Sequence, residues 1–194
     1  RLYDKDFYGY GSLEQILTYH IDGNEYTIAT RDELVKQVPV LKKDFVKHSD
    51  FAGKTVKQIF KNFKLEEAKL FEATQFESLV LINNGGKGFA IQPLPIEAQF
   101  APIQAILMED LDGDGILDLL LGGNMTAVSP YFGAYQGSHG LALKGNGNGG
   151  FSIMENGKLG IQGDIKHIRS IKVKNETWIL FVKNDGELEV FKLK

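Results

Sequence analysis

The stretch that decides the fold covers residues 109–123 and has the sequence EDLDGDGILDLLLGG. Four aspartates and two glycines fall within residues 110–118, and a run of leucines follows. Oxygen ligands at alternate positions suit Ca²⁺, which accepts a flexible all-oxygen shell at about 2.3–2.6 Å. A glycine between them permits the tight turn that such a shell requires. The pattern therefore predicts a cation-binding loop that leads directly into a strand.

The predicted calcium ligands occupy positions one, three, five, seven and nine of this loop. They are Asp110, Asp112, Asp114, the main-chain carbonyl of Ile116, and Asp118. An EF-hand does not fit, because position twelve is a leucine in place of a bidentate glutamate and both flanks have the pattern of strands.

Two other interpretations of the loop stay open. The segment ILMEDLDGDG, residues 106–115, also resembles the DxDG motif of haloacid-dehalogenase-type phosphatases, in which the first aspartate attacks phosphorus. That motif should open an α/β domain, whereas β-hairpins follow here. The remaining interpretation is an acidic surface turn without metal, which requires the carboxylates to splay apart because they repel one another.

Two segments of the chain are repeated. DFYGYGSLEQIL, residues 6–17, aligns without gaps on DLDGDGILDLLL, residues 110–121, with Tyr8 and Tyr10 in place of the two middle aspartates. We therefore expect the first loop to keep its shape, to lack calcium, and to have its tyrosines packed over the turn. LVLINNGGKGFAI, residues 79–91, likewise resembles LALKGNGNGGFSI, residues 141–153.

Each repeat is a loop and strand followed by a hairpin, which is the form of a four-stranded propeller blade. The sequence predicts a mainly β chain, with one domain made of a partial β-propeller of about two to three four-stranded blades and a helical insertion. The predicted parts are listed in chain order: residues 1–29 with 76–92 for the first blade, 30–75 for the helical insertion, 93–154 for the calcium-loop blade, and 155–194 for the last, partial blade.

The insertion is predicted to be helical from the spacing of its apolar residues. Val56, Ile59, Phe60 and Phe63 follow one another at i, i+3, i+4 and i+7, which places them on one face of a helix.

Composition excludes several classes of function. The chain has 22 basic and 25 acidic residues in mixed order, which argues against nucleic acid or an anionic membrane as a partner. The absence of cysteine excludes disulfides and thiolate chemistry, and no apolar run approaches the roughly 20 residues that span a bilayer. The chain begins at Arg1 without an initiator methionine, so we expect it to be part of a longer protein.

Other candidate residues lie outside the aspartate loop. The four histidines are scattered, without a second ligand at zinc spacing, and the sequence indicates no catalytic residue. The aromatic segment of residues 127–140 contains Tyr131, Phe132 and Tyr135, which are candidates for stacking on sugars or binding peptide. Alternatively, these aromatic side chains close a gap between blades.

These motifs carry a family resemblance. DLDGDGILDLLLGGN, residues 110–124, followed by LALKGNGNGGFSIM, residues 141–154, resembles an FG-GAP or VCBS-type repeat of the integrin-α-like β-propellers. More narrowly, residues 94–124 are similar to the C-terminal region of bacterial proteins that resemble cartilage acidic protein and are common in Bacteroidetes. The resemblance covers residues 76–154 well and residues 6–17 weakly.

The resemblance implies a calcium-binding, non-enzymatic propeller segment of an exported bacterial protein, located extracellularly, in the periplasm or on the outer-membrane surface. It implies calcium at the five loop positions named above and binding to a protein or a glycan at the cell surface. The competing class is an enzyme, as a metal-dependent hydrolase or phosphatase or as an ancillary domain of a secreted hydrolase. Open blades expose strand edges, so we expect another copy of the chain or the rest of a longer propeller to cover them.

Overall fold

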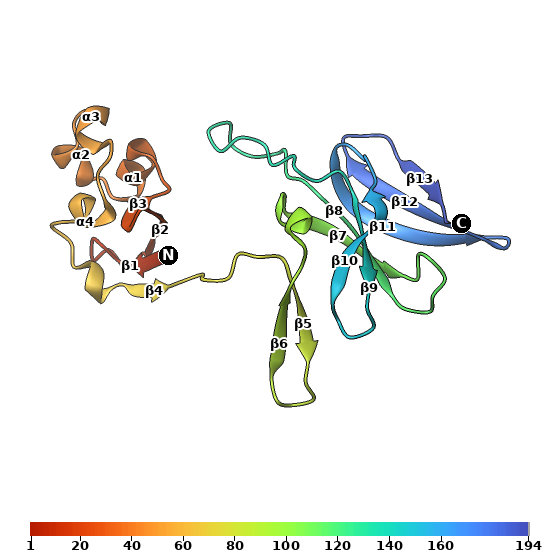
Figure 1. Cartoon of the computed structure of the whole chain (residues 1–194). Coiled ribbons are helices and arrows are strands. Elements are labelled where there is room, and N and C mark those ends of the chain that lie inside the picture. The colour runs from red at the N-terminus through yellow and green to blue at the C-terminus, as the bar shows by residue number, and fades with distance from the viewer. Residues whose placement is uncertain (194) are drawn as a thin grey trace. The chain divides into compact units, whose positions relative to one another are not determined.

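The computed structural model describes residues 1–193 and is mainly β, with antiparallel sheets of two to four strands. The chain divides into two compact units, Arg1–Phe76 and Glu77–Lys194 (Figure 1). The division falls at the predicted end of the helical insertion. Among the described residues, no helix has the length and apolar character needed to cross a membrane.

The first unit contains a four-stranded antiparallel sheet with the order β3-β2-β1-β4. Its strands are β1 Leu2–Lys5, β2 Glu14–Ile21, β3 Asn24–Thr27 and β4 Lys69–Phe71. A two-residue turn joins β2 to β3, and both of its residues, Asp22 and Gly23, have positive φ. Such a turn follows the twist of the strands on either side of it and so favours a tight hairpin.

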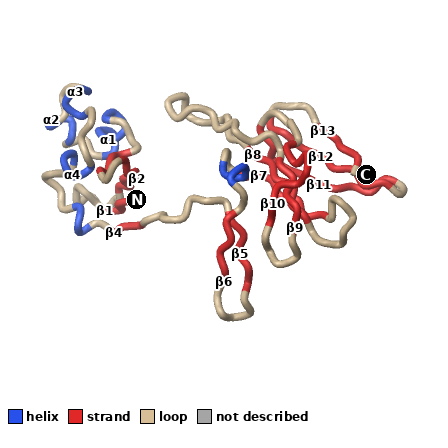
Figure 2. The backbone as a smooth tube through the Cα atoms, viewed as in Figure 1, coloured by secondary structure: helices blue, strands red, loops and turns tan. Residues whose placement is uncertain are grey.

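Short helices occupy residues 31–67 of the predicted insertion and pack on this sheet (Figure 2), whereas residues 69–71, also expected in the insertion, form the strand β4. Their bounds are α1 Arg31–Gln37, α2 Leu41–Asp44, α3 His48–Phe51, α4 Val56–Ile59 and η1 Leu65–Glu67. The spacing argument is confirmed: Val56, Ile59 and Phe60 are buried in one core, and Phe63 packs against it. Helix α4 is shorter than the pattern suggested and ends at Ile59.

The second unit contains a four-stranded meander with the order β10-β9-β8-β7, in which each strand pairs with the next along the chain. The strands are β7 Ile103–Glu109, β8 Asp118–Gly123, β9 Leu141–Gly145 and β10 Phe151–Lys158. Every residue of β8 is buried. A strand covered on both faces has a continuous apolar sequence, and this explains the leucine run after the aspartates.

The leucines of β8 enter two different cores because successive side chains of a strand point to opposite faces. Leu120 packs with residues of a three-stranded sheet, order β11-β12-β13, which covers one face. Leu119 and Leu121 pack on the other face with Leu94 and Ala98. The remaining elements are β5 Leu79–Asn83, β6 Phe89–Pro93, η2 Ile96–Gln99, β11 Asp164–Val173, β12 Glu176–Asn184 and β13 Glu189–Lys192.

The second pair of repeated segments forms two matching hairpins, β5 with β6 and β9 with β10. In the first, the N–H of Asn84 donates to the carbonyl of Gly88 at 3.1 Å, and in the second, that of Asn146 donates to the carbonyl of Gly150 at 3.0 Å. These four positions correspond in the sequence alignment. The two hairpins therefore share a hydrogen bond as well as a similar amino-acid sequence.

The strands expected to form the first blade belong to two different sheets. Residues 1–29 supply β1 to β3, which pair with one another and with β4, whereas β5 and β6, within residues 76–92, form a two-stranded sheet. The physical reason is the short connection after β2. The turn brings β3 back alongside β2, and closing this short loop costs less entropy than pairing β2 with a strand that is distant along the chain. The expected last blade consists of three strands, β11 to β13.

The glycines that end β8 are required by close packing. A Cβ added at Gly123 would lie 1.9 Å from the main-chain oxygen of Pro102, and that same oxygen accepts a hydrogen bond from the N–H of Asn124. We therefore expect Gly123→Ala to push β7 away from β8 and to lower the free energy of unfolding by about 1–3 kcal/mol. Urea unfolding measures this effect.

The matched control for this test is Ser152→Ala, a change at an exposed position of β10 in the same sheet. Equal unfolding midpoints for the two variants would show that β7 and β8 can approach each other even when residue 123 has a side chain.

Candidate metal centre

The aspartate loop connects β7 to β8, and its first aspartate closes the turn. Asp110 Oδ1 accepts a hydrogen bond from the N–H of Gly113 at 2.7 Å, and Oδ2 accepts one from the N–H of Gly115 at 3.0 Å. Both glycines have positive φ, 79° and 84°, a conformation that a side chain would strain. The tight turn expected at Gly115 is present, and Gly113 contributes equally to it.

The last aspartate of the loop, Asp118, is buried and joins three elements. It is the first residue of β8, its Oδ2 accepts from the N–H of Leu111 in the loop at 2.9 Å, and its Oδ1 accepts from the N–H of Gly145 on β9 at 2.8 Å. A Cβ at Gly145 would lie 2.2 Å from the carbonyl oxygen of Leu117, so glycine permits this approach. These bonds offset the cost of burying the carboxylate.

The two middle aspartates each accept one hydrogen bond from the main chain. Asp112 Oδ1 accepts from the N–H of Asp114 at 3.3 Å, and Asp114 Oδ1 accepts from the N–H of Ile116 at 2.8 Å. Both are bonds between a side chain and the main chain two residues on, as in Asx-turns. Their other oxygens face the ammonium of Lys144, which contacts Asp112 Oδ2 and lies 2.8 Å from Asp114 Oδ2.

The charges of this cluster shift the pKa values of two of its members. The pKa of Asp114 is lowered, chiefly by its hydrogen bond with Lys144 and then by that with the Ile116 N–H. The pKa of Lys144 is raised by its hydrogen bonds with Asp112 and Asp114. Lys144 was not among the residues predicted from the sequence. The available signal was one charged residue inside the otherwise apolar strand LALKG.

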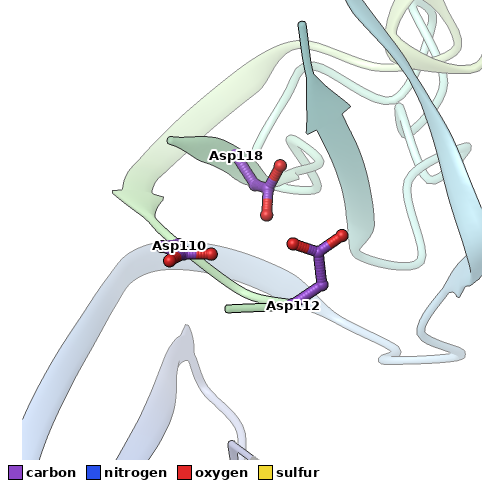
Figure 3. Close-up of side chains that lie close together, drawn as sticks. All are labelled: Asp110, Asp112 and Asp118. Carbon is purple, nitrogen blue, oxygen red and sulfur yellow. The ribbon is translucent and has the colours of Figure 1, made fainter. Parts of the chain in front are cut away.

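The carboxylates of Asp110, Asp112 and Asp118 each offer one oxygen within 4.8 Å of the others (Figure 3). Each carboxylate oxygen has two lone pairs, so a main-chain hydrogen bond leaves room for a cation at the same atom. Hard oxygen donors of this kind suit Ca²⁺ or Mg²⁺. The other two predicted ligands lie outside this group of three. Asp114 pairs with Lys144, and the N–H of Ile116 donates a hydrogen bond to Asp114 Oδ1.

The first repeated loop, between β1 and β2, is closed by the same bonds. Asp6 Oδ1 accepts from the N–H of Gly9 at 2.6 Å, and Oδ2 accepts from the N–H of Gly11 at 2.7 Å. Glu14 Oε2 accepts from the N–H of Phe7 at 2.8 Å, as Asp118 accepts in the second loop. We call these bonds, accepted by the first and last carboxylate of each loop, the loop frame. The predicted repetition of loop shape is confirmed.

The tyrosines that replace the middle aspartates make aromatic contacts. The rings of Tyr8 and Tyr10 stack with centroids 5.4 Å apart and planes inclined by 23°. Tyr8 packs against the core of the first unit and its hydroxyl accepts a hydrogen bond from the N–H of Val40, whereas Tyr10 is 82% exposed. The loop frame therefore forms without the two middle carboxylates.

The aromatic segment between β8 and β9 forms a loop that extends away from its sheet (Figure 1). Met125 and Tyr135 bond to each other through both main-chain N–H groups at 2.9 Å, which closes the base of the loop. Tyr131 and Phe132 lie beyond it with ring centroids 4.3 Å apart. The structure thus brings together two of the three predicted aromatics near the tip, and all three are exposed.

No family model, no curated protein and no solved structure matches this chain.

The loop frame predicts a pH effect in the first unit. Main-chain N–H groups, that of Gly11 foremost, lower the pKa of Asp6 by bonding to its charged form. Because the pKa of Asp6 is lower in the folded chain than in the unfolded chain, its charged carboxylate stabilises the fold at a pH above the unfolded pKa of about 3.9. This contribution disappears as the pH falls through the folded pKa. We expect Asp6→Ala to destabilise the chain near neutral pH and to lose this effect in strong acid.

Urea unfolding between pH 2 and pH 7 measures the difference between the wild type and Asp6→Ala. The control is Glu66→Ala, which removes an exposed carboxylate of the same unit. A difference that stays constant across this range of pH would contradict the assignment of the effect to the charged carboxylate of Asp6.

Proposed function

We propose that this chain is a calcium-binding, non-enzymatic segment of an exported β-propeller protein. The observation that carries the proposal is the comparison of the two loops. Asp6 and Glu14 form a loop frame without further carboxylates, so the frame does not require Asp112 and Asp114 in the second loop. These two additional negative charges lie beside Asp110 and repel one another, and the single ammonium of Lys144 offsets only one of them, so the loop favours a further cation.

The proposed ion has a structural role. Asp118 is both a candidate ligand and the first residue of the buried strand β8. An ion held by Asp110, Asp112 and Asp118 would fix the two ends of the loop to each other and so stabilise the pairing of β7 with β8. A nucleophilic role for Asp110 is less favourable, since both of its oxygens already accept glycine N–H groups.

The propeller part of the proposal is supported by the second unit. Its four-stranded sheet has the meander order of a propeller blade. The sheet β11 to β13 packs on one of its faces through Ile165, Ile168 and Phe181. Together with the resemblance to FG-GAP and VCBS-type repeats, this packing supports two successive blades of a longer propeller. Location outside the bacterial cytoplasm follows from that resemblance and suits weak calcium sites, which extracellular modules use.

The first test is a calcium-dependent rise in melting temperature. At a calcium concentration about 100-fold above the Kd, a single site should raise the melting temperature of the second unit by about 5–10 °C. Asp112→Asn should abolish most of this rise, because it removes the charge of one ligand. Differential scanning calorimetry with calcium and with EDTA measures it.

The matched control is Asp185→Asn, an equal loss of charge in the turn after β12, at a position with a positive φ that asparagine tolerates. An unchanged calcium response in Asp112→Asn would contradict the proposed site. Metal-dependent phosphatase activity that disappears in Asp110→Asn would instead favour the hydrolase alternative.

We further propose that the aromatic loop binds a protein or a glycan at the cell surface. Tyr131 and Phe132 present adjacent exposed rings near the tip of a loop whose base is hydrogen-bonded, and such rings stack well on sugars and peptide groups. We expect Tyr131→Ala with Phe132→Ala to weaken binding to immobilised oligosaccharides or cell-surface proteins by about tenfold or more.

Glycan arrays and binding to intact bacterial cells provide the readout. Tyr10→Ala is the control, since it removes another highly exposed aromatic ring from the same chain. Equal binding by both variants would exclude the loop as the contact surface.

A further inference from the structure

Lys144 lies on β9, the strand next to β8, and its side chain reaches the aspartate loop. Its ammonium contacts Asp112 Oδ2 and lies 2.8 Å from Asp114 Oδ2. The side chain of Lys144 is 43% exposed, so the ammonium is at the surface and can leave the loop by rotation about its flexible stem. Within the structure it is the cation that the two middle aspartates share.

The internal repeat shows that the hairpin itself does not require this lysine. The hairpin β5–β6 matches the hairpin β9–β10, and Ile82 is the residue that corresponds to Lys144. The hairpin β5–β6 is a separate sheet from the one that holds β1 and β2, on either side of the loop with tyrosines. The hairpin β9–β10 pairs with β8, directly after the aspartate loop, and it carries the lysine.

We propose that the ammonium of Lys144 is a built-in counter-ion of the loop and that it competes with the divalent ion for Asp112. Asp112 belongs both to the ion pair with Lys144 and to the group of three converging carboxylates. A divalent ion bound to that group would lie close to the ammonium and repel it. The ion therefore enters as the lysine leaves.

This inference rests on the proposed calcium site and adds its regulation. Because the lysine is tethered beside its partners, it is always available to replace the ion, at an effective concentration that does not depend on the solvent. Calcium must displace it, and the affinity of the loop is correspondingly lower. The loop then loads where free calcium is abundant and returns to the lysine-held state where calcium is scarce.

Isothermal titration of the full chain with Ca²⁺ tests the competition. Lys144→Met keeps the apolar stem and removes the charge, and it should bind calcium about two- to fivefold more tightly than the wild type. The control is Lys158→Met, an identical change on β10 of the same sheet, where the lysine lies 3.8 Å from Glu97. This control should bind calcium as the wild type does.

Thermal unfolding in EDTA supplies a readout that does not depend on calcium. Without any ion, Lys144→Met should melt below Lys158→Met, since Asp112 and Asp114 lose their shared counter-ion, and added calcium should remove that difference. If Lys144→Met binds calcium with wild-type affinity, the competition is overturned while the calcium site stands. If none of the three proteins binds calcium, the proposed function fails and the competition with it.

Discussion

The structure of the second unit depends on one buried carboxylate. Asp118 lies where the loop, the central strand β8 and the neighbouring strand β9 meet, and its two oxygens accept N–H groups from Leu111 and Gly145. A carboxylate is costly to bury without partners, so its position, and with it the start of β8, is fixed by those two bonds. The leucines of β8 can then enter both cores because the strand begins at a defined residue.

Much of this arrangement could be predicted from the sequence. The gapless alignment of residues 6–17 with residues 110–121 anticipated that both loops have the same shape, and the loop frame shows why: a carboxylate at each end and glycines between them are sufficient. The leucine run predicted a strand, and the helical spacing around Val56 predicted a buried helical face. These features depend on local hydrogen bonds and on periodicity, which neighbouring residues determine.

The partners of strands and side chains were harder to predict, because they depend on contacts between distant positions. The first blade was expected to combine strands from two distant segments, but the sequence pattern does not specify which strands pair. In the structure, β2 pairs with β3 in a hairpin, and β5 and β6 form a sheet of their own. Lys144 was missed for the same reason: it is 32 residues from Asp112 along the chain and becomes its neighbour through the pairing of β8 with β9. The calcium ligands themselves remain a prediction.

The loop frame has a consequence for how such a chain changes over evolutionary time. Because the bonds of the loop frame are accepted by the outer carboxylates, the residues at the two middle positions are free to vary while those bonds stay in place. Tyrosine at these positions in one copy and aspartate in the other show two outcomes of that freedom. A repeat could therefore gain or lose charge at these positions through a few substitutions, while the bonds of its loop frame remained. Duplication followed by such exchanges would produce a protein whose repeats share the hydrogen bonds of their loops and differ in the charge that those loops carry.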